Sequence, residues 1–234
     1  MTFLILSCSD SVDEDENLND FTKDSGFFID ERDGHQYKWV KIRDQIWMAE
    51  NLKYLPSVVG PATGSQTTPH YYVYGYDGTN VADAKATTNY ATYGVLYNWP
   101  AAMKGEASST SNPSGVQGVC PKGWHLPSDA EWKQLSYYLG GASIAGGKLK
   151  QTGTTHWYFP NTGATNESGF TALPGGERNS DGIFNYIEIS GSWWSSTEIN
   201  ADIGWLLDMS SNLSDATENG YEKSYGFSIR CVKD

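Results

Sequence analysis

Alternating hydrophobic and polar positions near the start of the chain predict two short β-strands. Residues 37–42 and 45–48 are rich in β-branched and aromatic side chains, which suit a pleated, half-buried strand. Only Arg43 and Asp44 separate the two runs, a spacing typical of a tight hairpin turn. Because this turn contains no glycine to ease a positive φ angle, we expect an antiparallel hairpin with local strain in its turn.

A helix is predicted over residues 128–139, where apolar positions recur at helical spacing. Ser128 and Glu131 form a capping box, in which each side chain accepts a hydrogen bond from the backbone N–H of the other residue. The apolar residues of one helix face follow at i, i+3 and i+7: Trp132, Leu135 and Leu139. The glycines at 140–141 supply the C-terminal stop, and a shorter helical turn is expected over residues 144–149.

The other predicted elements are short strands between loops rich in Gly, Asn, Asp and Ser. The strand-forming runs are residues 183–189, 192–195, 204–209 and 226–232. Residues 60–89 and 104–117 are rich in turn-forming residues and predict long irregular loops. The pattern therefore predicts an α+β fold with an antiparallel sheet, one or two short helices and much loop.

Charge adds a domain boundary to this picture. The chain has 234 residues and a formal net charge of −12, from 28 acidic and 16 basic side chains. Ten of the acids lie between Ser9 and Asp33 with only two basic residues, so this segment holds two thirds of the net charge. A block of like charge with few apolar residues cannot offset its ordering entropy by burial. We expect residues 9–26 to form an acidic flexible tether and residues 27–234 to form one folded domain.

The composition also excludes two classes of protein. Phosphate binding needs a basic face, so nucleic acid is not expected as a partner of this acidic chain. No stretch approaches the roughly 20 apolar residues that a membrane-spanning helix needs. An integral membrane protein is therefore excluded, and any contact with a membrane should be made through an anchor.

The first eight residues suggest such an anchor. The stretch Ile5-Leu6-Ser7-Cys8 resembles a bacterial lipobox, in which the cysteine is lipidated and becomes the first mature residue. We interpret residues 1–8 as a truncated lipoprotein signal and the acidic segment after Cys8 as its spacer. The resemblance implies an exported protein, lipid-anchored at the outer membrane or cell surface. The alternative is a frayed apolar N-terminus with an incidental cysteine.

The two remaining cysteines, Cys120 and Cys231, are expected to form a disulfide. Exported proteins lie in oxidising compartments where disulfides persist. Once Cys8 is lipidated, only one pairing of the other two is possible. The alternative is two separate buried thiols.

Eight sequence blocks in register carry a family resemblance. They include Ile46-Trp-Met-Ala-Glu-Asn-Leu52, Trp124-His-Leu-Pro-Ser-Asp-Ala-Glu-Trp132 and Gly226-Phe-Ser-Ile-Arg-Cys-Val232. Over residues 27–234 the chain resembles the Fibrobacter succinogenes major paralogous domain, a family of exported bacterial proteins. One departure is Arg43, where that family tends to have glycine. The resemblance implies a C-type-lectin-like fold, similar also to the formylglycine-generating enzymes, with a disulfide from the helix region to the last strand.

A catalytic site is not expected. The four histidines show no metal-ligand spacing: His35, His70, His125 and His156. Formylglycine-generating enzymes use free active-site cysteines, which a disulfide between Cys120 and Cys231 would remove. We expect His125 to be a structural histidine bonded to nearby backbone, and Asp129 and Glu131 to be helix-end residues. No metal, cofactor or enzyme activity is predicted.

A binding role fits the sequence better. Calcium-dependent lectins need hard oxygen ligands beside a Trp-Asn-Asp run, and the comparable place here holds Trp193-Trp-Ser-Ser-Thr-Glu198. Aromatic rings could still stack on sugars without metal; those beside polar loop residues are Trp157, Tyr158, Tyr186 and Trp205. The alternative is that these rings belong to the core. The residues predicted to contact a ligand are Asp181, Asn185, Tyr186, Glu188 and Trp205.

Two function classes follow from these observations. The first is a monomeric, lipid-anchored cell-envelope module that binds a glycan or a surface protein. The second is a structural or adhesive component of a surface assembly. A third, less favoured alternative is an enzyme of the formylglycine-generating type, which would need both cysteines reduced and facing a cleft.

Overall fold

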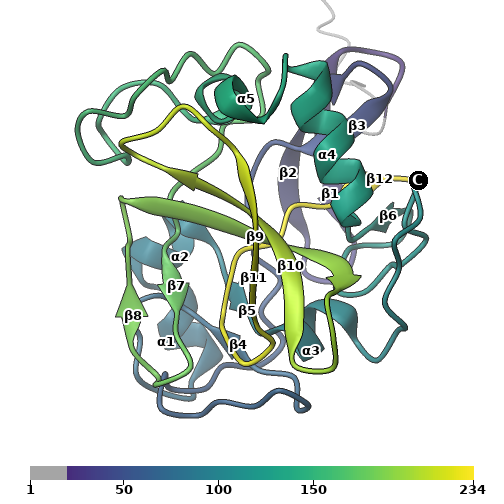
Figure 1. Cartoon of the computed structure of the whole chain (residues 1–234). Helices are drawn as coiled ribbons and strands as arrows, with labels where there is room; N and C mark the ends of the chain where they lie inside the picture. Colours follow the sequence, from purple (N-terminus) through teal and green to yellow (C-terminus); the bar gives the residue numbers. More distant parts are fainter. Residues whose placement is uncertain (1–19) are drawn as a thin grey trace, which may run out of the picture.

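The computed structural model describes residues 20–234, which form a mixed α+β fold of antiparallel sheets and short helices (Figure 1). Cys8 and most of the acidic segment lie outside the described residues. Within the described part, no helix is long and apolar enough to span a membrane. The predicted α+β class is therefore confirmed.

A five-stranded sheet brings the two ends of the chain together. Its strand order is β1-β2-β3-β12-β6, and neighbours are antiparallel. Its strands are β1 (Ser25–Asp30), β2 (His35–Ile42), β3 (Gln45–Met48), β6 (Trp124–His125) and β12 (Val232–Lys233). The folded part begins before the expected Phe27, since β1 starts at Ser25 and the ring of Phe21 lies 5.1 Å from that of Trp39.

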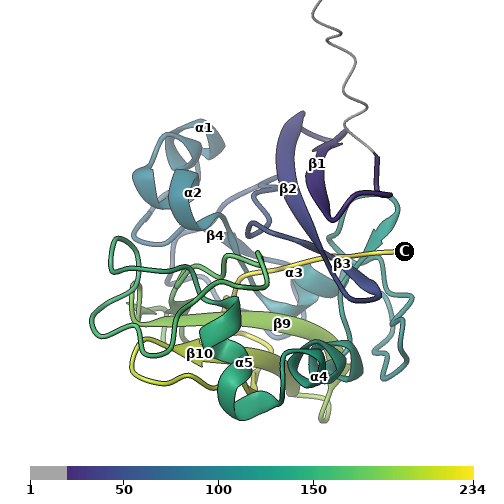
Figure 2. The same ribbon diagram turned by 90° about the horizontal axis from the view of Figure 1, so that it is seen from above.

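A second sheet of three strands forms the other half of the molecule. Its order is β11-β10-β9, and its strands are β9 (Ser190–Glu198), β10 (Ile203–Ser210) and β11 (Thr217–Glu222). Helices α4 (Asp129–Tyr138) and α5 (Ala142–Leu149) lie beside each other, with α4 against β9 and β10 (Figures 1 and 2). Two small two-stranded sheets complete the strands: β4 (Tyr71–Tyr72) with β5 (Leu96–Tyr97), and the hairpin of β7 (Glu177–Arg178) with β8 (Phe184–Asn185).

The predicted helix is confirmed together with its capping box. The Ser128 hydroxyl accepts from the Glu131 N–H, and the Glu131 carboxylate accepts from the Ser128 N–H. Gly140 and Gly141 both have positive φ angles, of 100° and 103°, which a non-glycine residue rarely adopts. They end α4 and start α5 within two residues, so this glycine pair fixes how the two helices meet.

Three further helices were not predicted, because each is only five or six residues long and depends on a local cap. They are α1 (Val81–Lys85), α2 (Thr88–Tyr93) and α3 (Trp99–Met103). The side chains of Asn80, Thr87 and Asn98 each accept from a backbone N–H in the first turn of the helix that follows.

Two of the predicted strands are much shorter in the structure. Residues 183–189 hold only β8, and residues 226–232 form β12 only at their end. The segment before Val232 instead makes single bridges to several elements, from Phe227 to Tyr97 and from Ser228 to Trp193. It is buried on all sides, so its apolar composition reflects its central position and not a long strand.

The core consists of two hydrophobic clusters with a polar junction, and Asn51 lies at that junction. Its side-chain carbonyl accepts from Trp193 Nε1 and from Arg230 Nε, both at 2.9 Å. Arg230 also donates to the carbonyls of Met48, Phe170 and Thr171. Burial lowers the pKa of this guanidinium to about 9. Backbone carbonyls therefore satisfy a fully buried cation, and the junction ties the two sheets together.

Cys120 and Cys231 form a disulfide, as predicted, and both residues are fully buried. The bond fastens the loop before β6 to the residue that precedes β12. It thus holds the last strand in its interior position in the five-stranded sheet, between β3 and β6.

Candidate functional site

The β7–β8 hairpin positions the first part of the candidate site. Glu177 on β7 lies directly opposite Asn185 on β8, so their side chains share one face of the hairpin. Gly176, with a φ angle of 66°, lets the chain pass close to the backbone of Asn185, because an added Cβ would lie 2.5 Å from the Asn185 carbonyl oxygen. Asp181 is exposed in the hairpin loop.

The turn that leads from this hairpin into β9 has unusual backbone geometry. Tyr186 and Glu188 have φ angles of 60° and 65°, although neither is glycine. The N–H groups of Ile189 and Ser190 both donate to the Tyr186 carbonyl, and the N–H of Glu188 donates to the Pro174 carbonyl. Two left-handed residues held in one turn store strain, and such positions concentrate at functional sites.

A second loop lies against this turn. The N–H of Tyr158 donates to the carbonyl of Glu188 at 2.6 Å, so residues 157–160 adjoin the turn at the same edge of the molecule (left in Figures 1 and 2). The exposed fractions are 63% for Tyr158, 75% for Phe159 and 56% for Tyr186. We call the surface formed by Tyr158, Phe159, Tyr186 and Glu188 the loop face.

Two acids with raised pKa values lie beside the loop face. Burial, followed by the charge of Asp208, raises the pKa of Glu177 to about 7. Burial also raises the pKa of Asp208, although the hydroxyls of Ser190 and Ser192 donate to its carboxylate at 2.8 and 2.6 Å. Within residues 20–234 neither acid has an ion-pair partner, and the Glu177 carboxylate accepts no hydrogen bond. The pair is thus a candidate for contacts with a ligand.

Tyrosine side chains connect the acid pair with the loop face. Burial raises the pKa of Tyr221, and the nearby groups that raise it further include Asp208, Glu177 and Tyr186. The ring of Tyr221 lies 5.3 Å from that of Tyr225, and both tyrosines are partly exposed. The candidate site therefore combines carboxylates, hydroxyls and aromatic rings from β7, β8, β10, β11 and two loops.

The comparisons with known proteins agree with the blocks in the sequence. The profile of the Fibrobacter succinogenes major domain family matches residues 40–233. The chain belongs to this family. No match was found among curated proteins or among solved structures.

The structure places four of the five predicted ligand residues of this family member in one region. Asn185, Tyr186 and Glu188 belong to the β7–β8 hairpin and the turn after it, and Asp181 lies in the loop of the same hairpin. Trp205 lies on the other face of the three-stranded sheet. Trp205 on β10 pairs with Gly220 on β11, and Glu218 lies two residues from Gly220. Since successive strand residues point to opposite faces, Trp205 and Glu218 share a face, and Glu218 pairs with Lys133 on α4. The structure thus does not bring Trp205 to the candidate site.

Of the other two aromatic candidates, Trp157 is buried in the core and Tyr158 is exposed. Trp157 is a core residue, because it is buried and its indole N–H donates to the Ala172 carbonyl at 2.9 Å. Its neighbour Tyr158 is exposed. The core alternative therefore holds for Trp157 and not for Tyr158.

Sequence reasoning missed Glu177 and Asp208. Asp208 interrupts the otherwise apolar run of β10, which was a detectable signal of a polar site on one face of that strand. Glu177 follows a pair of glycines, and nothing local distinguishes it from an ordinary loop acid. Its importance comes from burial and from a neighbour on another strand.

His125 has a different set of partners from the one expected. Its Nδ1 lies 2.8 Å from a carboxylate oxygen of Asp234, and its Nε2 lies 2.7 Å from one of Glu131. The expected bond to backbone is wrong because both ring nitrogens are occupied by carboxylates. Glu131 in turn accepts from the N–H groups of Ser114 and Ser128, so it is a helix-end residue that also joins this network.

Among residues 20–234, no group of three or more His, Cys, Asp or Glu side chains could hold a metal ion. The carboxylate oxygens of Glu177 and Asp208 are hydrogen-bond acceptors that a ligand with hydroxyl groups could use.

Proposed function

We propose that the protein is a non-catalytic cell-envelope module that binds a glycan through the loop face. The observation that supports this most strongly is the group of three exposed rings on two adjoining loops, beside the half-buried Glu177 carboxylate, which has no ion-pair or hydrogen-bond partner among residues 20–234. Exposed rings stack on the apolar faces of sugars, and carboxylates accept hydrogen bonds from sugar hydroxyls. The tyrosine hydroxyls and the Asn185 amide add both hydrogen-bond donors and hydrogen-bond acceptors.

We further propose that the fold is C-type-lectin-like. The antiparallel sheets, the long loops and the two adjacent helices are consistent with this assignment. The disulfide between Cys120 and Cys231 joins the chain ahead of α4 to the chain ahead of the last strand, as the family resemblance implies. In such a fold the loops supply the binding surface, and the sheets hold them in place.

The proposed location is the outer membrane or cell surface, with a lipid anchor at Cys8. The lipobox-like stretch and the acidic segment after it support this proposal. The test is mass analysis of protein extracted from membranes of its bacterial host. Acyl groups on Cys8 would support the anchor, whereas an unmodified Cys8 in a fully soluble protein would contradict it.

A glycan array with the full chain tests the binding proposal. The variant Tyr158→Ala/Phe159→Ala/Tyr186→Ala should lose binding to every glycan that the wild type retains. Tyr137→Ala is the matched control, because Tyr137 is 78% exposed on α4 and lies outside the loop face. Wild-type protein that binds no glycan, or a triple variant that binds as well as the control, would contradict the proposal.

A surface-assembly role is the second candidate, and one observation favours it. Exposed apolar side chains at the loop face and next to it, such as Phe159, Ile183 and Ile189, could pack against a protein. Sedimentation of the wild type distinguishes this role, because self-association abolished by the triple variant would indicate assembly. We do not propose the formylglycine-generating reaction, since the disulfide leaves neither Cys120 nor Cys231 as a free thiol.

A further inference from the structure

The strand β1 forms one edge of the five-stranded sheet, and half of its backbone groups point away from the sheet. Among the described strands it pairs only with β2. The Lys41 N–H donates to the Asp24 carbonyl just before β1, so in this antiparallel register the even-numbered residues of β1 bond to β2. The N–H and C=O groups of the odd-numbered residues therefore form the free edge: Ser25, Phe27 and Ile29.

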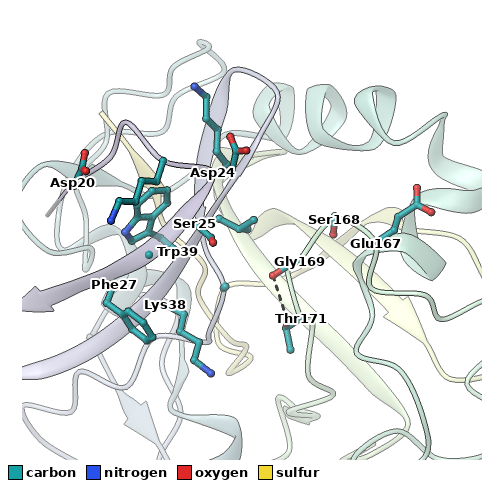
Figure 3. Close-up of a pocket in the computed structure, with 15 residues that line it drawn as sticks. Asp20, Asp24, Ser25, Phe27, Lys38, Trp39, Glu167, Ser168, Gly169 and Thr171 are labelled. Atoms are coloured by element: carbon teal, nitrogen blue, oxygen red, sulfur yellow. Dashed lines mark hydrogen bonds between the residues drawn. The ribbon is translucent and has the colours of Figure 1, made fainter. Parts of the chain in front are cut away.

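The side chains of the free edge share one face of β1 and are exposed. The exposed fractions are 41% for Phe27 and 42% for Ile29, whereas Phe28 between them is buried. Figure 3 shows Phe27 beside Lys38, its partner on β2. Cavities of about 850 and 440 Å³ lie along the strand: Ser25 and Phe27 line the first, and Ile29 lines the second. Open space thus adjoins the free edge, where apolar side chains lie next to unpaired backbone groups.

Strand β1 also lacks the features that protect a sheet edge from pairing with another chain. Such edges carry charges, proline or a bulge, or they are very short. The three free-edge residues of β1 include no charge and no proline, and its register with β2 has no bulge. In contrast, β4, β5, β6, β7 and β8 have two residues each, β11 carries Glu218 and Glu222, and most of β9 is buried. Within the described sheets, β1 is therefore the edge best suited to another strand.

We propose that β1 pairs with β1 of a second copy of this chain, so that the protein forms an antiparallel dimer and does not remain a monomer. The two-fold axis passes between the two Phe27 residues. In this register every free-edge residue lies opposite a free-edge residue of the second copy, since Phe27 faces Phe27 and Ser25 faces Ile29. The backbone groups bond across the axis, the two phenyl rings make contact, and the two five-stranded sheets become one.

The charges beyond the two ends of β1 match in the same register. Lys23 precedes β1 and Glu31 follows it, so Lys23 of each copy lies opposite Glu31 of the other. Both side chains are exposed, and neither forms an ion pair in the part of the chain that the structure describes. Asp20 lies near Lys23, but its carboxylate accepts from the N–H and the hydroxyl of Thr22. The charge pattern of β1 is thus complementary to itself, which favours a second copy as the partner.

Sedimentation of the full chain over a range of concentrations tests the dimer. The chain has a net charge of −12, so about 0.15 M salt limits the long-range repulsion between copies. The wild type should show a monomer–dimer equilibrium. Phe27→Pro should abolish the dimer, because it removes an N–H that points away from β2, a position where an edge strand tolerates proline. Phe27→Ala keeps that N–H and should only weaken the dimer, and thermal unfolding checks that both variants are folded.

An exchange of charges tests the register. Lys23→Glu and Glu31→Lys should each raise the dimer dissociation constant about tenfold, because each turns two attractive pairs into two repulsive ones. The double variant Lys23→Glu/Glu31→Lys should return to nearly the wild-type value. Lys104→Glu is the control, because it makes the same change of charge at an exposed lysine outside β1.

Three outcomes would overturn the proposal. They are a wild type that stays monomeric up to about 0.1 mM, a Phe27→Pro variant that dimerises like the wild type, and an exchange of charges that does not restore the dimer. Self-association that the triple variant of the loop face abolishes, and that Phe27→Pro leaves unchanged, would place the contact between copies at the loop face and likewise overturn it.

Discussion

At the residue scale, His125 links three parts of the chain. The imidazole is buried and bonded to Glu131 on α4 and to Asp234 after β12. Replacement by alanine leaves the buried Glu131 carboxylate with one partner fewer. We expect His125→Ala to lower the free energy of unfolding by about 1–3 kcal/mol in denaturant titrations at pH 6. Asp181 is exposed, and its side chain makes no hydrogen bond to the other described residues, so Asp181→Ala should change the free energy of unfolding by much less. Equal losses in the two variants would contradict this role for His125.

The same histidine predicts a pH dependence of stability. Burial alone lowers the pKa of His125, but the hydrogen bonds and charges of Glu131 and Asp234 outweigh it and raise the pKa above 6.5. The folded state therefore binds a proton that the unfolded state releases first. The stabilisation is complete below pH 6.5 and is lost as the pH rises through the folded-state pKa. The difference between wild type and His125→Ala should shrink from pH 6 to about pH 9, and a difference that grows would contradict the assignment.

Glu177 should make the free energy of unfolding depend on pH near neutrality, which exposed acids do not. Its pKa of about 7, against an ordinary 4.5, means that the folded state keeps a proton that the unfolded state loses. The free energy of unfolding therefore falls as the pH rises from 4.5 to 7. Glu177→Gln should be more stable than wild type at about pH 8, by on the order of 1 kcal/mol after solvent screening, and equal to it at about pH 4. Equal stability at both pH values would show that the carboxylate is well solvated.

At the scale of elements, the β2–β3 hairpin shows what local sequence can determine. Its strands were predicted at residues 37–42 and 45–48 because β-branched and aromatic residues alternate there, and the structure confirms both. The capping box and the apolar stripe likewise predicted α4. The helices α1, α2 and α3 were missed since their caps lie in segments whose composition is that of loops. Local patterns thus predict elements that are long enough for the pattern to repeat.

The strain expected in this hairpin turn is present and can be removed. Arg43 has a φ angle of 57°, which costs a non-glycine residue about 1–2 kcal/mol. Glycine avoids that cost but loses more entropy on folding. We expect Arg43→Gly to raise the free energy of unfolding by about 0.5–1 kcal/mol, measured by thermal and denaturant unfolding.

Gly34, in the turn between β1 and β2, is the reverse control for Arg43→Gly. Its φ angle is 74°, and an added Cβ would meet nothing within 4 Å. Any destabilisation by Gly34→Ala is therefore conformational in origin and should be of similar size and opposite sign. A destabilising Arg43→Gly would show that the arginine side chain contributes more than its strain.

At the scale of the whole molecule, the candidate site was only partly predictable. The sequence predicted Asn185, Tyr186 and Glu188 together, because they are close in sequence and belong to one loop rich in polar and aromatic residues. Their association with Glu177, Asp208 and Tyr221 depends on how the β7–β8 hairpin meets the three-stranded sheet, which no local pattern records. Trp205 was misplaced for the same reason, because the face on which a strand residue lies is set by strand pairing. The sequence therefore predicted the polar and aromatic loop, and it did not predict the buried acids or the geometry that brings them to it.

The disulfide provides the whole-molecule test of the fold. Cys120 and Cys231 are 111 positions apart, and a cross-link over such a loop contributes about 4–5 kcal/mol in the chain-entropy account. Cys120→Ser and Cys231→Ser should each lower the melting temperature by the same amount. The double variant should lower it little further, because either single change already breaks the same bond. Unequal single variants with additive effects, or two free thiols titrated in the oxidised folded protein, would show that the cross-link does not hold the last strand between β3 and β6.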